Sequence, residues 1–173
     1  FRTFVLLGDG ESQEGQVWEA ALSAPRWQLD RLTAIVDYNH LQLDGLVDEI
    51  LPLEPLLAKW AAFGWATREI DGHDMAQVLA ALTWASDPAQ HPHRPAVIVA
   101  HTVKGKGVSF MEGNNEFHGK APSPVEREQA LAEIEAQLAA LAVADEQAVL
   151  GEQHAQREPR GQGAQRDARR DGR

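Results

Sequence analysis

The 173-residue sequence contains no cysteine, which excludes disulfide frameworks, thiolate metal sites and cysteine nucleophiles. Basic residues are also scarce, because 16 Lys and Arg stand against 26 Asp and Glu, for a formal net charge of -10. This balance argues against a nucleic-acid binder or a protein that binds anionic membranes. No apolar run reaches the roughly 18 residues that span a bilayer. No basic segment followed by an apolar stretch opens the chain, so we expect no secretory signal and a cytoplasmic location.

The residues that are present are typical of one globular domain, with 43% hydrophobic and 24% charged residues. The chain starts at Phe1, directly before a segment, TFVLLGDG, that has the character of a buried strand. We therefore expect a domain at 1–150 that is incomplete at its N-terminus. Residues 151–173 contain no Ile, Leu, Val, Met or aromatic residue, which predicts a disordered tail rich in Arg, Gln and Gly.

Apolar strands and amphipathic helices alternate along the domain. Strands are predicted at 3–7, 32–36, 65–70 and 95–102, and helices at 13–24, 55–63 and 74–85, with Asp74 as an N-cap. Each strand is a continuous apolar run, which predicts an α/β fold whose mostly parallel sheet has helices on both faces. A last helix is predicted from Val125 to Leu150, with apolar residues at a/d spacing, which fits either packing on its own domain or a short coiled-coil contact.

Two polar residues follow the first two predicted strands. Asp9 ends the first strand, and Asn39 follows the second about thirty positions later, which is the length of one βαβ unit. A right-handed crossover places such strands side by side with both carboxyl ends at one edge of the sheet, where open α/β sheets bind ligands. A carboxylate and an amide oxygen are donors suited to Mg²⁺ or Ca²⁺.

The turn after the first strand predicts a phosphate ligand. Gly10 lacks a side chain and offers its N–H near a helix start, which suits a phosphate. Asp9, Glu11 and Glu14 are acidic, however, and carboxylates repel phosphates. A divalent cation between protein and phosphate removes this conflict. The segment therefore predicts a di- or triphosphate bound through a metal ion, although Gly-Asp-Gly alone also fits an ordinary strand-to-helix turn.

The run GDGESQEGQVWEAALSAPRWQLDRLTAIVDYNHLQLDG resembles the Gly-Asp-Gly…Asn motif of thiamine diphosphate enzymes. The residues within this run are similar to those of transketolase, particularly to the N-terminal subunit of bacterial split transketolases. FGWATREIDGHD, HTVKGKGVSFME and FHGKAP fit the same family, and together the similar stretches cover about residues 3–123. The resemblance thus implies a thiamine diphosphate-binding fold, present here in part.

The resemblance implies roles for individual residues. Asp9 and the Asn39 side chain would be metal ligands, joined by the backbone carbonyl of Leu41. Gly10 and Asn39 would contact the diphosphate of the cofactor. His118 would lie near the diphosphate and the substrate, as a hydrogen-bond donor or a proton relay. His40 departs from the small or polar residue that the family often has, so its side chain must point away from the metal ligands or the site is altered.

The same resemblance implies transketolase chemistry, the transfer of a two-carbon ketol unit from a ketose phosphate to an aldose phosphate. The cofactors would be thiamine diphosphate and Mg²⁺ (or Ca²⁺). Because the family's activating glutamate belongs to another domain, we expect half of a site, inactive alone, with a C-terminal transketolase subunit or domain as partner and a dimer of complete protomers. The alternatives are another thiamine diphosphate enzyme (an oxo-acid dehydrogenase α subunit or a deoxyxylulose phosphate synthase) and a non-catalytic remnant of the fold.

Overall fold

The computed structural model describes residues 1–157, with side chains described up to Val143. The chain divides into a first compact unit, Phe1–Ala130, and a second that begins at Leu131. Every strand within residues 1–157 belongs to the first unit. The features that position the candidate site therefore lie within Phe1–Ala130.

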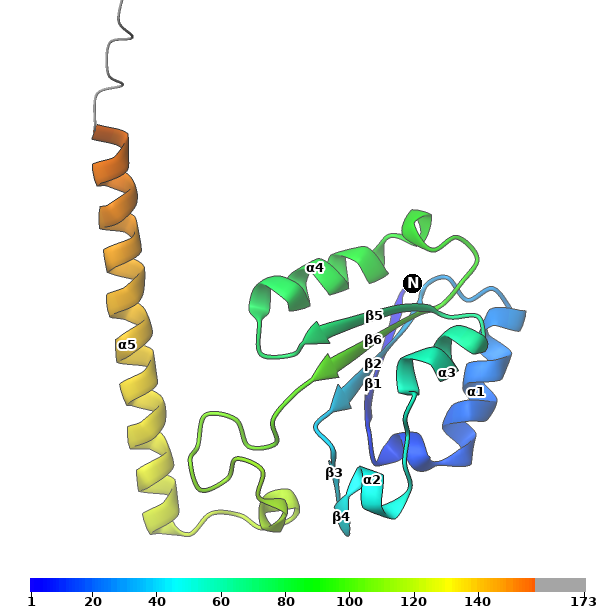
Figure 1. Cartoon of the computed structure of the whole chain (residues 1–173), viewed down its shortest axis with the longest axis horizontal. Coiled ribbons are helices and arrows are strands. Elements are labelled where there is room, and N and C mark those ends of the chain that lie inside the picture. Colours follow the sequence, from blue (N-terminus) through cyan, green and yellow to red (C-terminus); the bar gives the residue numbers. More distant parts are fainter. Residues whose placement is uncertain (158–173) are drawn as a thin grey trace, which may run out of the picture. The chain divides into compact units, whose positions relative to one another are not determined.

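The centre of the first unit is a four-stranded sheet in the order β1-β2-β6-β5, shown in Figure 1. Its strands are β1 (Thr3–Gly8), β2 (Leu32–Tyr38), β5 (Ala66–Asp71) and β6 (Ala96–His101). Every pairing is parallel. These pairings confirm the predicted parallel sheet and its four strands. The prediction succeeded because continuous apolar runs joined by helices favour a parallel sheet.

Helices cover both faces of the sheet, as predicted. Helices α1 (Gly15–Arg26) and α3 (Leu56–Ala62) lie on one face, and α4 (Met75–Ser86) lies on the other (Figure 1). The first face has a large core in which Trp60 and Trp65 pack edge to face, with ring centroids 4.8 Å apart. Helix α4 packs through Ala81 and Ala85, whose small side chains allow close approach to β5 and β6.

Asp74 caps helix α4 as expected. Its carboxylate accepts hydrogen bonds from the backbone N–H groups of Ala76 at 2.9 Å and Gln77 at 3.2 Å. These bonds satisfy donors that have no partner inside a helix. The capped turn fixes the end of β5 beside the start of α4.

Strand β1 is less covered than the sequence predicted. The side chains of Phe4, Val5 and Leu6 are 47%, 38% and 70% exposed. A continuous apolar run indicates a strand that is buried on both faces, but β1 is the edge strand of the sheet and α4 packs on the opposite edge. Coverage of both faces therefore applies to the inner strands rather than to β1.

Helix α5 (Pro124–Arg157) is the last described element. It continues past Leu150, where the helix was predicted to end, so residues 151–157 of the predicted disordered tail are helical. The rest of the predicted tail, 158–173, lies outside the described residues. A polar sequence can extend an existing helix, because propagation adds a hydrogen bond for each residue. The a/d residues Leu131, Ile134, Leu138 and Leu141 are exposed, and both interpretations of that spacing remain predictions. Within residues 1–157, no helix has the length and apolar content to cross a membrane.

Candidate functional site

The carboxyl ends of β1 and β2 bring Asp9 and Asn39 to the same edge of the sheet. The parallel register pairs Gly8 with Asp37, so the two chains leave the sheet at the same level. The backbone N–H of Asp9 donates to the carbonyl oxygen of Asp37 at 3.2 Å, which extends the pairing by one residue. The spacing argument therefore gives the correct neighbours.

The carboxylate of Asp9 is buried and surrounded by backbone donors. Only 1% of Asp9 is exposed. Its Oδ1 accepts from the N–H of Gly10 at 2.8 Å, and its Oδ2 accepts from the N–H of His40 at 2.5 Å. Burial raises the pKa of Asp9, the backbone hydrogen bonds oppose that rise, and the nearby carboxylate of Asp37 adds to it. A divalent cation at this position would stabilise the charged form of the Asp9 carboxylate.

The loop after β2 is held by side-chain hydrogen bonds. The Oδ1 of Asn39 accepts from the N–H of Leu41 at 3.0 Å, and its Nδ2 donates to the Oδ2 of Asp37 at 3.3 Å. The other oxygen of Asp37 accepts from the hydroxyl of Thr102, which follows β6. Asp37 thus connects the ends of three neighbouring strands, which fixes the position of Asn39.

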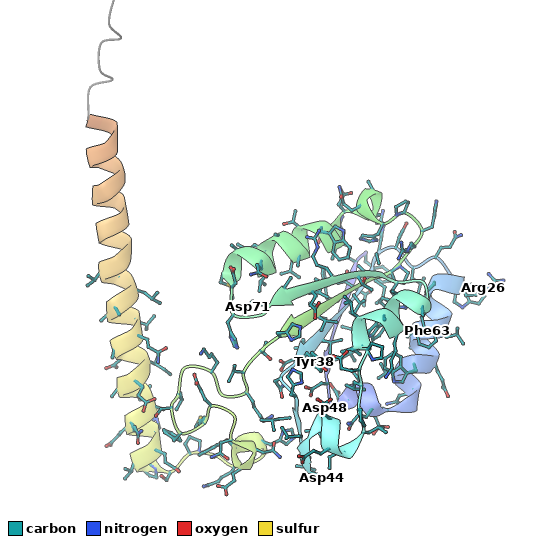
Figure 2. All side chains as sticks on the ribbon, viewed as in Figure 1. Arg26, Tyr38, Asp44, Asp48, Phe63 and Asp71 are labelled. Carbon is teal, nitrogen blue, oxygen red and sulfur yellow. The ribbon has the colours of Figure 1, made fainter. Side chains whose placement is uncertain are left out.

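A short hairpin follows this loop, formed by β3 (Leu41–Gln42) and β4 (Gly45–Leu46), with Asp44 at its tip, as Figure 2 shows. Helix α2 (Val47–Ile50) comes directly after it. The side chain of Asn115, in the 3₁₀ helix η3 (Asn115–His118), donates to the carbonyl oxygens of Gln42 and Leu43, each at 2.8 Å. These bonds attach the segment that carries His118 to the hairpin.

These segments enclose a hollow of about 550 Å³. All five residues that the sequence analysis assigned to the site line it: Asp9, Gly10, Asn39, Leu41 and His118. The structure therefore brings together residues from separate segments of the chain. Three further acidic residues line the hollow, Glu11, Glu14 and Asp37. Its wall is therefore rich in oxygen atoms that could ligate a metal ion.

The walls of the hollow fit a metal-bound diphosphate. Carboxylate, amide and carbonyl oxygens are the ligands that Mg²⁺ and Ca²⁺ prefer. Within the described side chains, no group of three or more His, Cys, Asp or Glu residues could hold a metal ion. The amide oxygen of Asn39 and backbone carbonyl oxygens are the other ligand types that line the hollow. A Cβ atom on Gly10 would lie 2.8 Å from the Cβ of Gln42, which shows how closely the two loops approach. The N–H of Gly10 donates to Asp9 in this structure, so a phosphate would have to share that donor.

Sequence reasoning does not identify two polar residues of this region, Asp37 and Thr102, and it leaves the placement of a third, Lys104, open. Asp37 and Thr102 lie at the ends of predicted strands, and no motif marks their hydrogen bond. The sequence around Lys104 fits a plain surface loop and a loop near the site equally well. The structure places Lys104 on the wall of the hollow, with its Nζ 3.2 Å from the Nδ1 of His118. The signal that could have found it is its position directly after the strand at 95–102, at the same edge as Asp9 and Asn39.

His40 points away from the hollow. Its ring packs on the ring of Tyr38, with centroids 4.1 Å apart, and it is not among the residues that line the hollow. The histidine at this position therefore packs on Tyr38 and does not line the hollow.

Fold and site together define a parallel α/β domain whose loops gather oxygen donors and a lysine at the carboxyl edge of the sheet. The chain belongs to the transketolase family, because the family described as "Transketolase, thiamine diphosphate binding domain" matches residues 1–159.

Curated relatives agree with this family. The 6-deoxy-6-sulfo-D-fructose transketolase subunit SqwG of Clostridium sp. is 44% identical over 132 residues, which are 76% of this chain and 47% of that protein. An apulose-4-phosphate transketolase subunit from Actinobacillus succinogenes is 44% identical over 133 residues, 77% of this chain and 47% of that protein. The chain thus spans about half the length of these relatives.

Solved structures share the fold. Transketolase from Campylobacter jejuni matches with a TM-score of 0.71 and 28% identity, over 78% of this chain and 20% of that one. Transketolase from Leishmania mexicana matches with a TM-score of 0.61 and 23% identity, over 84% of this chain and 24% of that one. The second likeness concerns the fold alone.

Proposed function

We propose that this chain supplies the metal- and diphosphate-binding half of a transketolase active site, which transfers a two-carbon ketol unit from a ketose phosphate to an aldose phosphate. The observation that carries the proposal is the convergence of Asp9, Gly10, Asn39, Leu41 and His118 on one hollow. Family membership supports thiamine diphosphate as the ligand. When bound, this cofactor supplies the carbon nucleophile of the reaction, while the protein binds and orients it.

The carboxylate of Asp9, the amide oxygen of Asn39 and the carbonyl oxygen of Leu41 would hold Mg²⁺ (or Ca²⁺). Asp9 is buried beside a second carboxylate, that of Asp37, which makes a cation at this point favourable. The ion would also offset the repulsion between these acids and a diphosphate. The hydrogen bonds around Asn39 would keep its side chain oriented toward the ion.

Gly10, Lys104 and His118 would act on the other parts of the ligands. Gly10 has no side chain to keep a diphosphate from the backbone. Lys104 would place a positive charge beside the phosphate oxygens. His118, which lies 3.2 Å from Lys104 through its Nδ1, would donate a hydrogen bond or move a proton at the substrate.

The substrates and partner are proposed from the relatives. The names of both relatives denote one subunit of a transketolase, for 6-deoxy-6-sulfo-D-fructose in one case and for apulose-4-phosphate in the other. We infer sugar phosphates or sugars with a comparable anionic group as substrates. We also infer a C-terminal transketolase subunit or domain as partner, within a dimer of complete protomers.

Cofactor binding is tested by titrating thiamine diphosphate with Mg²⁺ into the intact gene product in a calorimeter. The expected result is binding that requires the metal and is lost in Asp9→Ala. Glu135→Ala removes an exposed carboxylate from α5 and serves as the control, with unchanged binding expected. If the intact protein shows no binding either alone or with its C-terminal partner, the non-catalytic alternative replaces the proposal.

The reaction is tested by ketol transfer between sugar phosphates after mixing with the C-terminal partner. His118→Ala is expected to lower kcat/KM by about 10²- to 10⁴-fold, the usual contribution of a general acid or base. Decarboxylation of an oxo acid without ketose turnover would instead assign the chain to a different class of thiamine diphosphate enzyme.

A further inference from the structure

We propose that His40 is a positioning residue for the metal site, because its ring, resting on Tyr38, holds the backbone turn that directs the ligands. The proposal rests on the proposed function for the identity of what the site binds. His40 lies between Asn39 and Leu41, so any change in its backbone moves both of them. His40 itself is not among the residues that line the hollow.

The backbone of His40 is in the left-handed region, with φ at +64°. This conformation is unfavourable for a residue with a Cβ atom, although His, Asn and Asp adopt it more often than other residues do. The turn uses both backbone groups of His40. Its N–H donates to the Oδ2 of Asp9 at 2.5 Å, and its carbonyl oxygen accepts from the N–H of Val47 at 3.0 Å. The left-handed turn is therefore what supplies a donor to the buried carboxylate.

The ring of His40 packs on the ring of Tyr38, which is itself held in place by hydrogen bonds. Tyr38 is 1% exposed, and Figure 2 shows it at the end of β2. The hydroxyl of Tyr38 donates to the Oε1 of Glu54 at 2.6 Å, and the Oε2 of Glu54 accepts from the N–H of Leu56 at 2.8 Å, at the start of α3. The ring of His101 completes a cluster with these two rings, with its centroid 5.4 Å from that of Tyr38 and 6.3 Å from that of His40. Contact with this cluster compensates for the strain at position 40.

Loss of the His40 ring should therefore change the backbone of residues 39–41, although the ring itself does not line the hollow. Without the contact to Tyr38, residues 39–41 can relax toward negative φ, which turns the N–H of position 40 away from Asp9. The Asp9 carboxylate then loses a donor, and Asn39 and Leu41 change direction. Changes to groups that orient metal ligands typically weaken metal binding by about 10- to 100-fold.

Two substitutions isolate the ring, because both keep the strain of the backbone conformation. His40→Ala removes the ring but keeps the Cβ atom, and with it the strain of positive φ. His40→Phe keeps an aromatic ring for Tyr38 and keeps the strain. The affinity for Mg²⁺ with thiamine diphosphate, measured by calorimetry on the intact gene product, is expected to fall by about 10-fold or more in His40→Ala and to stay near wild type in His40→Phe. Wild-type affinity in His40→Ala, or an equal loss in both variants, overturns the proposal.

Hydrogen exchange without ligand provides a second, independent measurement. Peptides covering residues 38–43 should exchange faster in His40→Ala than in wild type after correction for intrinsic rates, while His40→Phe stays protected. Helix α4, on the other face of the sheet, reports on overall stability and should be unchanged. If the wild type binds no cofactor, the proposed function fails and this measurement alone decides the role of His40. Equal exchange of 38–43 in wild type and His40→Ala shows that the ring does not hold the turn.

Discussion

Gly10 lies against Gln42 where the first βα loop meets the β3–β4 hairpin. A Cβ atom on Gly10 would be 2.8 Å from the Cβ atom of Gln42 and 3.6 Å from its Cα atom. The backbone of Gly10, with φ -59° and ψ -40°, is one that any residue adopts. Glycine is therefore required here by the close approach of two loops and not by conformation.

We expect Gly10→Ala to separate the two loops and to weaken metal-dependent cofactor binding. The hairpin must move because the clash involves the Cβ atom nearest the backbone, which cannot rotate away. Calorimetric titration of the variant measures the effect. Gly15→Ala is the matched control, since a Cβ atom there meets nothing within 4 Å. Equal binding by Gly10→Ala and wild type would contradict this explanation of the glycine.

We expect Gly72→Ala to destabilise the protein by about 1–3 kcal/mol, the usual cost of overpacking. A Cβ atom at this turn would lie 2.5 Å from the Cγ2 atom of Thr102 and 3.1 Å from the carbonyl oxygen of His101. Because Thr102 donates to Asp37, its displacement also disturbs the site edge. Urea denaturation measures the loss, and Gly119→Ala, where a Cβ atom has open space, should leave stability nearly unchanged.

Two buried tryptophans should respond differently to replacement by phenylalanine. Helix α1 contains Pro25, which lacks the N–H that would bond to the carbonyl oxygen of Ala21 four residues earlier. The indole N–H of Trp65 donates to that oxygen instead, at 2.8 Å. The indole nitrogen of Trp60 has no hydrogen-bond partner among the described side chains and backbone.

Trp65→Phe leaves the carbonyl of Ala21 buried without this donor, which typically costs about 1–3 kcal/mol beyond the loss of packing. Trp60→Phe removes an N–H group that is already unsatisfied and changes the side-chain volume equally. Trp65→Phe should therefore lower the free energy of unfolding more than Trp60→Phe, as measured by chemical denaturation. The reverse order would show that volume outweighs the hydrogen bond.

The contact between Tyr38 and Glu54 predicts a pH dependence. The hydroxyl of Tyr38, followed by the N–H of Leu56, lowers the pKa of Glu54 below its ordinary value of 4.5. This carboxylate therefore stabilises the fold fully above pH 4.5, and the contribution is lost as the pH falls through the lower folded pKa. The stability gap between wild type and Glu54→Gln, measured by urea denaturation, should shrink as the pH falls below 4.5 and through the lowered pKa of Glu54. In a Tyr38→Phe background the pH-dependent gap should be smaller, and an unchanged gap would remove Tyr38 as the cause.

The sheet and its helices could be predicted because each is encoded locally. The apolar runs at 32–36 and 95–102 and the cap at Asp74 indicate elements without knowledge of their neighbours. The meeting of Asp9 and Asn39 also follows from local spacing, since one βαβ unit has only one common handedness. The resemblance then named His118, which local patterns alone would not have selected.

Other features depend on contacts that no short pattern encodes. The hydrogen bond between Thr102 and Asp37 joins strands whose order along the sheet differs from their order in the chain. The placement of Lys104 on the hollow requires the same strand order. The turn at His40 depends on a ring contact with Tyr38, because the residue type alone does not specify positive φ. The exposure of β1 follows from its place at the sheet edge, which hydrophobicity does not report.

Strand β1 has a practical consequence for anyone who handles this polypeptide. Phe4 and Leu6 are exposed on this edge strand. The strand can therefore contact another molecule through apolar side chains and through backbone hydrogen-bonding groups. We expect preparations of the 173-residue chain by itself to self-associate as concentration rises. Light scattering should therefore be measured before each titration, because aggregated protein would give an apparent loss of ligand binding.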